Sequence, residues 1–78
     1  MDSENLTRLV EIREMAASGE ARLIREKARV SVAELAEIVG INRTTLWSWE
    51  SGQHTPRGEK ALEWQKTLTL LQADERTA

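Results

Sequence analysis

The chain has 78 residues and a formal net charge of −2, a length that predicts one domain with a small core. It contains no cysteine and one histidine, which excludes a disulfide framework, a thiolate metal site and a site built from several histidines. No apolar run approaches the roughly 20 residues that span a bilayer, and the first residues, MDSENL, do not resemble a secretory leader. We therefore expect a cytoplasmic protein with no membrane contact, no metal and no cofactor.

The charges are unevenly distributed along the chain. Residues 1–20 carry five acidic and two basic side chains, residues 21–60 carry five and seven, and residues 61–78 carry three and two. From charge alone, an ordinary mixed surface is the simpler interpretation. A locally basic segment in an acidic chain remains compatible with nucleic-acid binding if the acids face away from the phosphates.

The hydrophobic pattern predicts an all-α chain of five helices and no strand. A first helix is expected at 5–17, with Ser3 or Asn5 as its cap and Ser18-Gly19 at its end. Its apolar stripe comprises Leu6, Leu9, Val10, Ile12 and Ala16. A second helix is expected at 20–28, with Ala21, Ile24 and Ala28 facing inward.

Residues 31–52, SVAELAEIVGINRTTLWSWESG, form the most informative segment. Ser31, followed three residues later by a glutamate, predicts a capping box at the start of a helix over 32–39. Gly40 supplies the positive φ at which that helix ends, and Asn42 caps a second helix over 43–51. Two short helices joined in this way are typical of a helix-turn-helix, whose second helix lies in a DNA major groove.

A fifth helix is expected at 59–73, after a loop in which Pro56 prevents helix continuation. Its inner stripe comprises Ala61, Trp64, Leu68 and Leu71. Residues 1–18 therefore form an N-terminal helix, residues 19–73 the helix-turn-helix domain, and residues 74–78 a tail expected to fray.

On the helix over 43–51, a spacing of 100° per residue places polar side chains on one outward arc. The arc comprises Arg43, Thr44, Trp47, Ser48 and Ser51. Arginine can bind guanine at two points, and serine and threonine suit either donors or acceptors on base edges. Trp47 either packs on sugars and thymine methyls or folds back over the loop at His54. A solvated helix face is the plain alternative for the polar residues, and the preceding turn favours DNA contact.

Arg25 and Glu50 border apolar faces of the second and fourth helices. We expect them to form a partly buried ion pair that ties the reading helix to the rest of the domain. Its role is structural rather than catalytic.

The run LIREKARVSVAELAEIVGINRTTLWSWESGQHTP resembles the lambda-repressor/Cro-like (XRE-type) family of helix-turn-helix DNA-binding domains. The resemblance implies a five-helix lambda-repressor-like fold, here with an extra N-terminal helix. It implies base reading by Arg43, Thr44 and Ser48, with Trp47 adjacent. The residues that it assigns to the DNA backbone are Asn42, Ser51, Gln53, His54 and Arg57, and its arginine–glutamate pair maps onto Arg25 and Glu50.

Three features depart from the family pattern. Val32 replaces a common glutamine that contacts phosphate or braces the reading helix. Gly58 stands where an aliphatic residue is usual, which predicts a loose start to the fifth helix. Residues 1–18 precede the usual start of the family, and they either fill the core or form a dimer contact.

The leading interpretation is a sequence-specific regulator of double-stranded DNA, a small phage or prokaryotic Cro-like repressor that binds as a homodimer. An antitoxin or a piece of a larger repressor fits nearly as well. The alternative from another class is a protein-interaction module with little direct DNA reading, supported by the net acidity, Val32 and an exposed Trp47. An enzyme with a small-molecule substrate is not expected, because no nucleophile or phosphate-loop motif is present.

Overall fold

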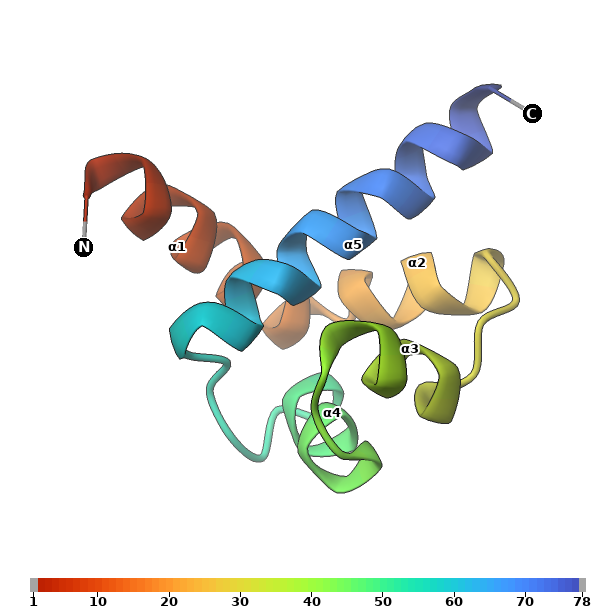
Figure 1. The fold of residues 1–78 in the computed structure, drawn as a ribbon, viewed down its shortest axis with the longest axis horizontal. Coiled ribbons are helices and arrows are strands. Elements are labelled where there is room, and N and C mark those ends of the chain that lie inside the picture. Colours follow the sequence, from red (N-terminus) through yellow and green to blue (C-terminus); the bar gives the residue numbers. More distant parts are fainter. Residues whose placement is uncertain (1, 78) are drawn as a thin grey trace.

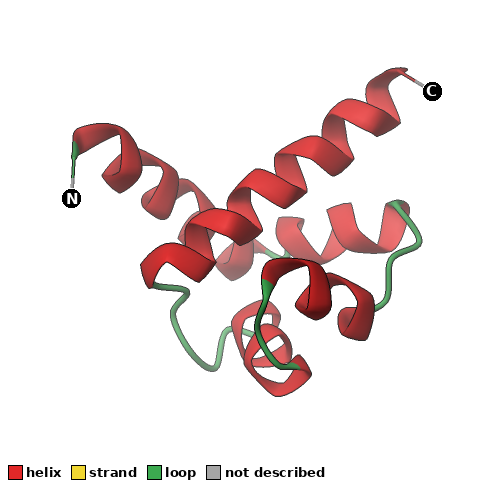
Figure 2. Ribbon diagram, viewed as in Figure 1, coloured by secondary structure: helices red, strands yellow, loops and turns green. Residues whose placement is uncertain are grey.

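The computed structural model describes residues 2–77 and the side chains of residues 2–73. This part of the chain consists of helices and connecting loops, with no strand (Figure 2). The helices are α1 (Ser3–Ser18), α2 (Glu20–Lys27), α3 (Val32–Val39), α4 (Arg43–Glu50) and α5 (Gly58–Thr77). Figure 1 shows α3 and α4 together below α5, with the loop 51–57 along the same lower edge. The predicted all-α architecture and the number of helices are confirmed.

The core draws side chains from all five helices. Its buried members are Leu9, Ile12, Ala16, Ala21, Ile24, Leu35, Ala36, Val39, Leu46, Trp49, Ala61, Trp64 and Leu68. Trp49 of α4 and Trp64 of α5 pack with their ring centroids 5.5 Å apart. An aromatic pair of this kind contributes roughly 0.5–1.5 kcal/mol beyond its area burial. Trp49 therefore fixes α4 against the long helix that crosses the domain.

The apolar stripe predicted for α1 is only partly correct. Leu9, Ile12 and Ala16 are buried, whereas Leu6 and Val10 are 52% and 45% exposed. The buried residues follow the i, i+3, i+7 spacing of one narrow face, which suffices for the contacts with α2 and α5. Leu6 and Val10 lie on the adjacent arc and remain uncovered within the described chain.

Helix ends differ from prediction at both termini of the chain. The cap of α1 is Asp2, whose carboxylate accepts the Asn5 N–H at 2.8 Å, and neither Ser3 nor Asn5 has that role. Helix α5 continues to Thr77, past the predicted end at residue 73. The tail 74–78, which was expected to fray, therefore belongs to α5 as far as residue 77, and Ala78 lies outside the described residues.

The turn between α3 and α4 forms as predicted. Ser31 and Glu34 make a reciprocal capping box at the start of α3. Gly40 ends that helix with φ of 86°, and its N–H donates to the Ala36 carbonyl at 2.9 Å. The Asn42 side chain then caps α4 by accepting the Thr45 N–H at 2.7 Å.

The backbone conformation at position 58 favours glycine, which the sequence alone did not reveal. It is the first residue of α5 and has φ of 76°, a conformation that an aliphatic residue rarely adopts. The glycine allows the chain to turn sharply out of the loop into α5. The departure from the family pattern therefore coincides with a backbone geometry that favours glycine.

Candidate nucleic-acid interface

The N-terminus of α4 is arranged to accept an anion. The first turns of α1, α2, α3 and α5 carry Glu4, Glu20, Glu34 and Glu59, whereas the first turn of α4 contains no acid and begins with Arg43. A cation at a helix N-terminus opposes the helix dipole by roughly 0.3–1 kcal/mol. The unbonded N–H groups of the first turn and the nearby guanidinium would both favour a bound phosphate.

The exposed side of α4 carries three of the four predicted base-reading residues. Arg43 and Thr44 are exposed, and Trp47 is 51% exposed. Ser48 is 7% exposed, so its predicted place on the outward arc was wrong. The loop after α4 folds back and covers it, because the Ser48 carbonyl accepts the N–H groups of Gln53 at 3.0 Å and His54 at 3.3 Å.

A basic hollow lies between α4, the loop 51–57 and the start of α5. It is lined by Arg13, Ile41, Thr44, Thr45, Ser48, Trp49, Gln53, His54, Thr55, Arg57 and Lys60. These residues include three cationic side chains and a histidine, and none of them is acidic. The hollow therefore offers positive charge and hydrogen-bond donors next to the N-terminus of α4.

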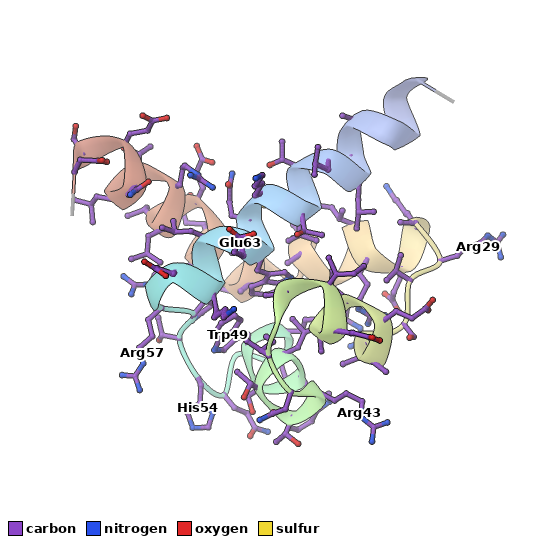
Figure 3. The ribbon with its side chains drawn as sticks, in the orientation of Figure 1. Arg29, Arg43, Trp49, His54, Arg57 and Glu63 are labelled. Carbon is purple, nitrogen blue, oxygen red and sulfur yellow. The ribbon has the colours of Figure 1, made fainter. Side chains whose placement is uncertain are left out.

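Figure 3 shows Arg43, His54 and Arg57 directed outward along the edge of the molecule where α4 lies. Gln53 is likewise exposed, and it lines the hollow with His54 and Arg57. Asn42 is exposed beside Arg43, although its side-chain oxygen is already used as the cap of α4. The structure thus gathers four of the predicted backbone-contacting residues on one side of the domain.

Ser51 is separate from this group. It is the C-cap of α4, and its hydroxyl donates to the Ser48 carbonyl at 3.3 Å. It lines a second, smaller hollow that also contains Trp47, Val32 and Arg22. The Trp47 ring therefore lies on the side of Val32 and α2, and the interpretation in which it folds back over His54 was wrong.

Two basic residues of the large hollow were not anticipated from the sequence. Lys60 lies in the first turn of α5, and its Nζ lies over the turn at Gly40. Arg13 comes from α1, and its Nε donates to the Pro56 carbonyl at 2.9 Å. The helical faces on which Arg13 and Lys60 lie were predictable from the sequence. The crossing of α1 and α5 that brings these two residues to the loop was not.

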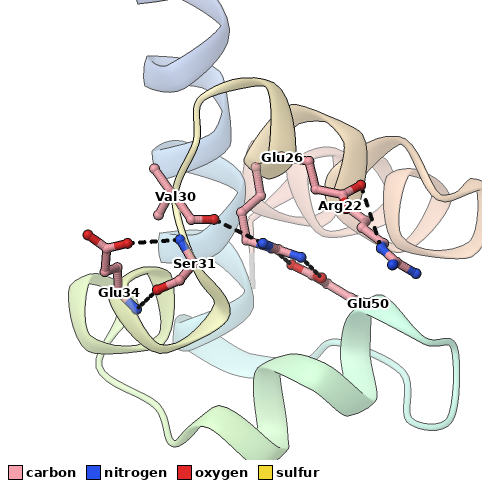
Figure 4. Close-up of polar contacts among 7 residues, drawn as sticks. Arg22, Glu26, Val30, Ser31, Glu34 and Glu50 are labelled. Carbon is pink, nitrogen blue, oxygen red and sulfur yellow. Dashed lines mark hydrogen bonds and ion pairs between the residues drawn. The ribbon is translucent and has the colours of Figure 1, made fainter.

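The expected pair between Arg25 and Glu50 is present and nearly buried (Figure 4). The Arg25 guanidinium donates from Nε and Nη2 to the two Glu50 carboxylate oxygens at 2.7 and 3.0 Å, and from Nη1 to the Val30 carbonyl at 2.9 Å. The hydrogen bond to Glu50 raises the pKa of Arg25 above its usual value. The Arg25 guanidinium therefore remains protonated. The pair fixes the last turn of α4 to α2.

A family model described as a helix-turn-helix domain matches residues 16–77. The chain belongs to this family. Membership agrees with the lambda-repressor-like arrangement of α2 to α5 and indicates, in general terms, a DNA-binding regulator of a typically non-enzymatic class. The match begins in the last turn of α1, so most of that helix precedes the shared segment.

Comparison of this helix-turn-helix domain with curated proteins and with solved structures gives no match. Over the residues that the structure describes, no helix is long and apolar enough to cross a membrane. The same residues contain no group of three histidine, cysteine, aspartate or glutamate side chains that could hold a metal ion.

Proposed function

We propose that the chain is a transcriptional regulator that binds double-stranded DNA in a sequence-specific manner, as a small Cro-like repressor of phage or prokaryotic type. The observation that carries this proposal is the acid-free N-terminus of α4, led by Arg43 and flanked by the basic hollow. An 8-residue helix held at both ends, with its polar side exposed, has the dimensions to enter a major groove.

In this proposal, base edges are read by Arg43, Thr44 and Trp47. Arg43 forms a bidentate contact with guanine, Thr44 contacts a neighbouring base, and the Trp47 ring packs on thymine methyls or sugars. Ser48 is omitted from this role because it is buried, and it is one of the residues that line the hollow.

The DNA backbone is contacted on the loop side of α4. Arg57 and His54 supply the longer contacts, Gln53 donates from its amide, and Asn42 donates from the amide nitrogen that its capping role leaves free. Ser51 sits at the opposite end of α4 and would reach a different phosphate from the one at the hollow. Such contacts position the domain without reading sequence.

A homodimer on DNA is part of the same proposal, with half-sites separated by about one turn, roughly 34–36 Å. Leu68 on α5 is completely buried in the core and is not available for that contact. Leu70 on α5 is 62% exposed and Leu6 on α1 is 52% exposed, and these side chains remain available to a second copy.

A protein-interaction module or antitoxin is the second candidate. It is favoured by the exposure of Trp47, at 51%, and of Ile38 on α3, at 64%, because exposed side chains of this size often mark protein contacts. This candidate requires weak DNA binding with little dependence on salt.

The test is selection of bound sequences from a random duplex pool, followed by affinity measurements at several salt concentrations. Enrichment of a palindrome with a steep salt dependence supports a dimeric repressor, and failure to enrich favours the protein-interaction alternative. Arg43→Ala should lose about 1–3 kcal/mol of discrimination between the selected site and a mismatched one. Equal loss on specific and random DNA would contradict base reading by Arg43.

Arg57→Ala serves as the matched comparison with the same type of truncation. Truncation of a residue that contacts only phosphate should weaken binding to all sequences alike and reduce the salt slope by about one unit for each bound protomer. A sequence-dependent effect of Arg57→Ala would show that its assignment to the DNA backbone is wrong.

A further inference from the structure

Helix α1 reaches the basic hollow through one residue. Arg13 lies beyond the N-terminal limit of the segment shared with the family, residues 16–77, yet it lines the hollow together with His54 and Arg57. Its Nε donates to the carbonyl of Pro56, a buried residue of the loop, at 2.9 Å. A side chain from α1 is therefore held at the proposed DNA-backbone surface.

The rest of the Arg13 guanidinium has no anion within the described chain. The two ion pairs found there join Arg22 to Glu26 and Arg25 to Glu50, and neither includes Arg13. Nε is used by Pro56, but the two Nη groups still carry four N–H donors, whose planar arrangement matches two phosphate oxygens. No acidic side chain lines the hollow to compete for them.

The position of the guanidinium is also restricted before any ligand binds. The hydrogen bond to Pro56 limits the rotamers of a half-buried side chain, so less conformational entropy is lost when a phosphate is bound. Arg57, by contrast, is exposed and comes from the loop itself. The Arg13 guanidinium is therefore held in position by one hydrogen bond, and its two Nη groups remain available as donors on the surface where a phosphate is expected.

We propose that Arg13 contacts a DNA phosphate directly, so that α1 extends the DNA-binding surface beyond the segment shared with the family. This inference rests on the proposed function, because it takes duplex DNA as the ligand. It assigns α1 a role in binding, in addition to the core packing of Leu9 and Ile12.

Arg13→Gln is the decisive variant. The amide nitrogen of glutamine occupies the place of the arginine Nε along the side chain, so the variant can keep the bond to Pro56 while it loses the charge and both Nη groups. Arg13→Lys keeps the charge and loses the planar fork. Arg8→Gln is the matched control, because Arg8 lies on the same helix and also donates to a backbone carbonyl, that of Leu62 at 3.3 Å, but does not line the hollow.

The measurement is affinity for the selected duplex, and for a random duplex, between 50 and 200 mM salt, with folding checked by circular dichroism. Each phosphate contact contributes about 0.9 to the slope of log K against log salt. Across this fourfold range, the wild type should lose about 3.5-fold more affinity than Arg13→Gln for each bound protomer, on both duplexes. Arg13→Lys and Arg8→Gln should keep the wild-type slope.

A folded Arg13→Gln protein with the wild-type slope would overturn the direct contact and leave the proposed function intact. Loss of affinity in Arg13→Gln without a change of slope would make Arg13 a residue that only positions the loop, and would also overturn the inference. A wild-type chain that binds neither duplex would instead refute the proposed function itself, and the inference with it.

Discussion

Truncation of Glu50 should destabilise the domain far more than truncation of an exposed acid. Glu50→Ala leaves the Arg25 guanidinium, whose side chain is 11% exposed, without its carboxylate partner. Removal of one member of a buried pair typically costs about 3–5 kcal/mol. Since Arg25 keeps its hydrogen bond to the Val30 carbonyl and some contact with water, we expect the lower value, about 3 kcal/mol. A domain of this size has a total stability of roughly 4–12 kcal/mol, so the loss is a large share of it.

Urea unfolding followed by tryptophan fluorescence measures this loss. With a slope of about 1–1.5 kcal/mol/M, the midpoint should fall by about 2–3 M. Glu26→Ala is the internal control, because its pair with Arg22 is exposed at 46% and 64% and should contribute less than about 0.5 kcal/mol. Replacing both buried partners, with Arg25→Met and Glu50→Leu together, should restore much of the stability. A cost below about 1 kcal/mol for Glu50→Ala would refute the reasoning, since the pair would then behave as an exposed one.

Two further predictions concern the helix-turn-helix backbone. The Ser31 backbone N–H donates to the Glu34 carboxylate and lowers the pKa of Glu34 below its ordinary value of 4.5. The capping box therefore stabilises the folded state above pH 4.5, and this contribution is lost as the pH falls through the lowered pKa. Glu34→Gln should therefore flatten this part of the acid unfolding curve, and an unchanged curve would contradict the linkage. Gly40→Ala should cost about 1–2 kcal/mol in urea unfolding, because φ is 86° there and the new Cβ would lie 2.8 Å from the flexible Lys60 Nζ. An unaltered midpoint would show that the turn relaxes without strain.

The elements of the helix-turn-helix were predictable because their signals are local. Ser31 and Glu34 are three residues apart, Gly40 stands directly after the last turn of α3, and Asn42 stands directly before α4. Each sets its helix end through bonds to neighbouring backbone atoms, which do not depend on the rest of the fold. The Arg25–Glu50 pair spans 25 residues and was predictable for another reason: both residues border apolar faces, and the family resemblance implied the same contact.

The errors arose where packing between distant segments decides the outcome. Helical periodicity placed Ser48 outward, but the loop after α4 returns over it through the N–H groups of Gln53 and His54. The same periodicity included Leu6 and Val10 in the stripe of α1, although the crossing with α5 covers only the face of Leu9 and Ile12. Periodicity reports which residues share a face, and it does not report how wide a strip of that face the neighbouring elements cover.

The interactions that hold α4 also explain how so short a helix can present a stable surface. Isolated helices of 8 residues are not stable in water, so α4 depends on its supports. Asn42 caps its first turn, Trp49 packs on Trp64, and Glu50 binds Arg25 across the domain. Two of these supports hold the C-terminal half of the helix, whereas the first turn is secured locally and carries Arg43. Substitutions at Trp49 or Glu50 should therefore displace the whole exposed face of α4. They should weaken binding to specific and to random DNA, and they should also lower the stability of the domain. Substitution of Arg43 should alter DNA discrimination and leave the unfolding midpoint nearly unchanged.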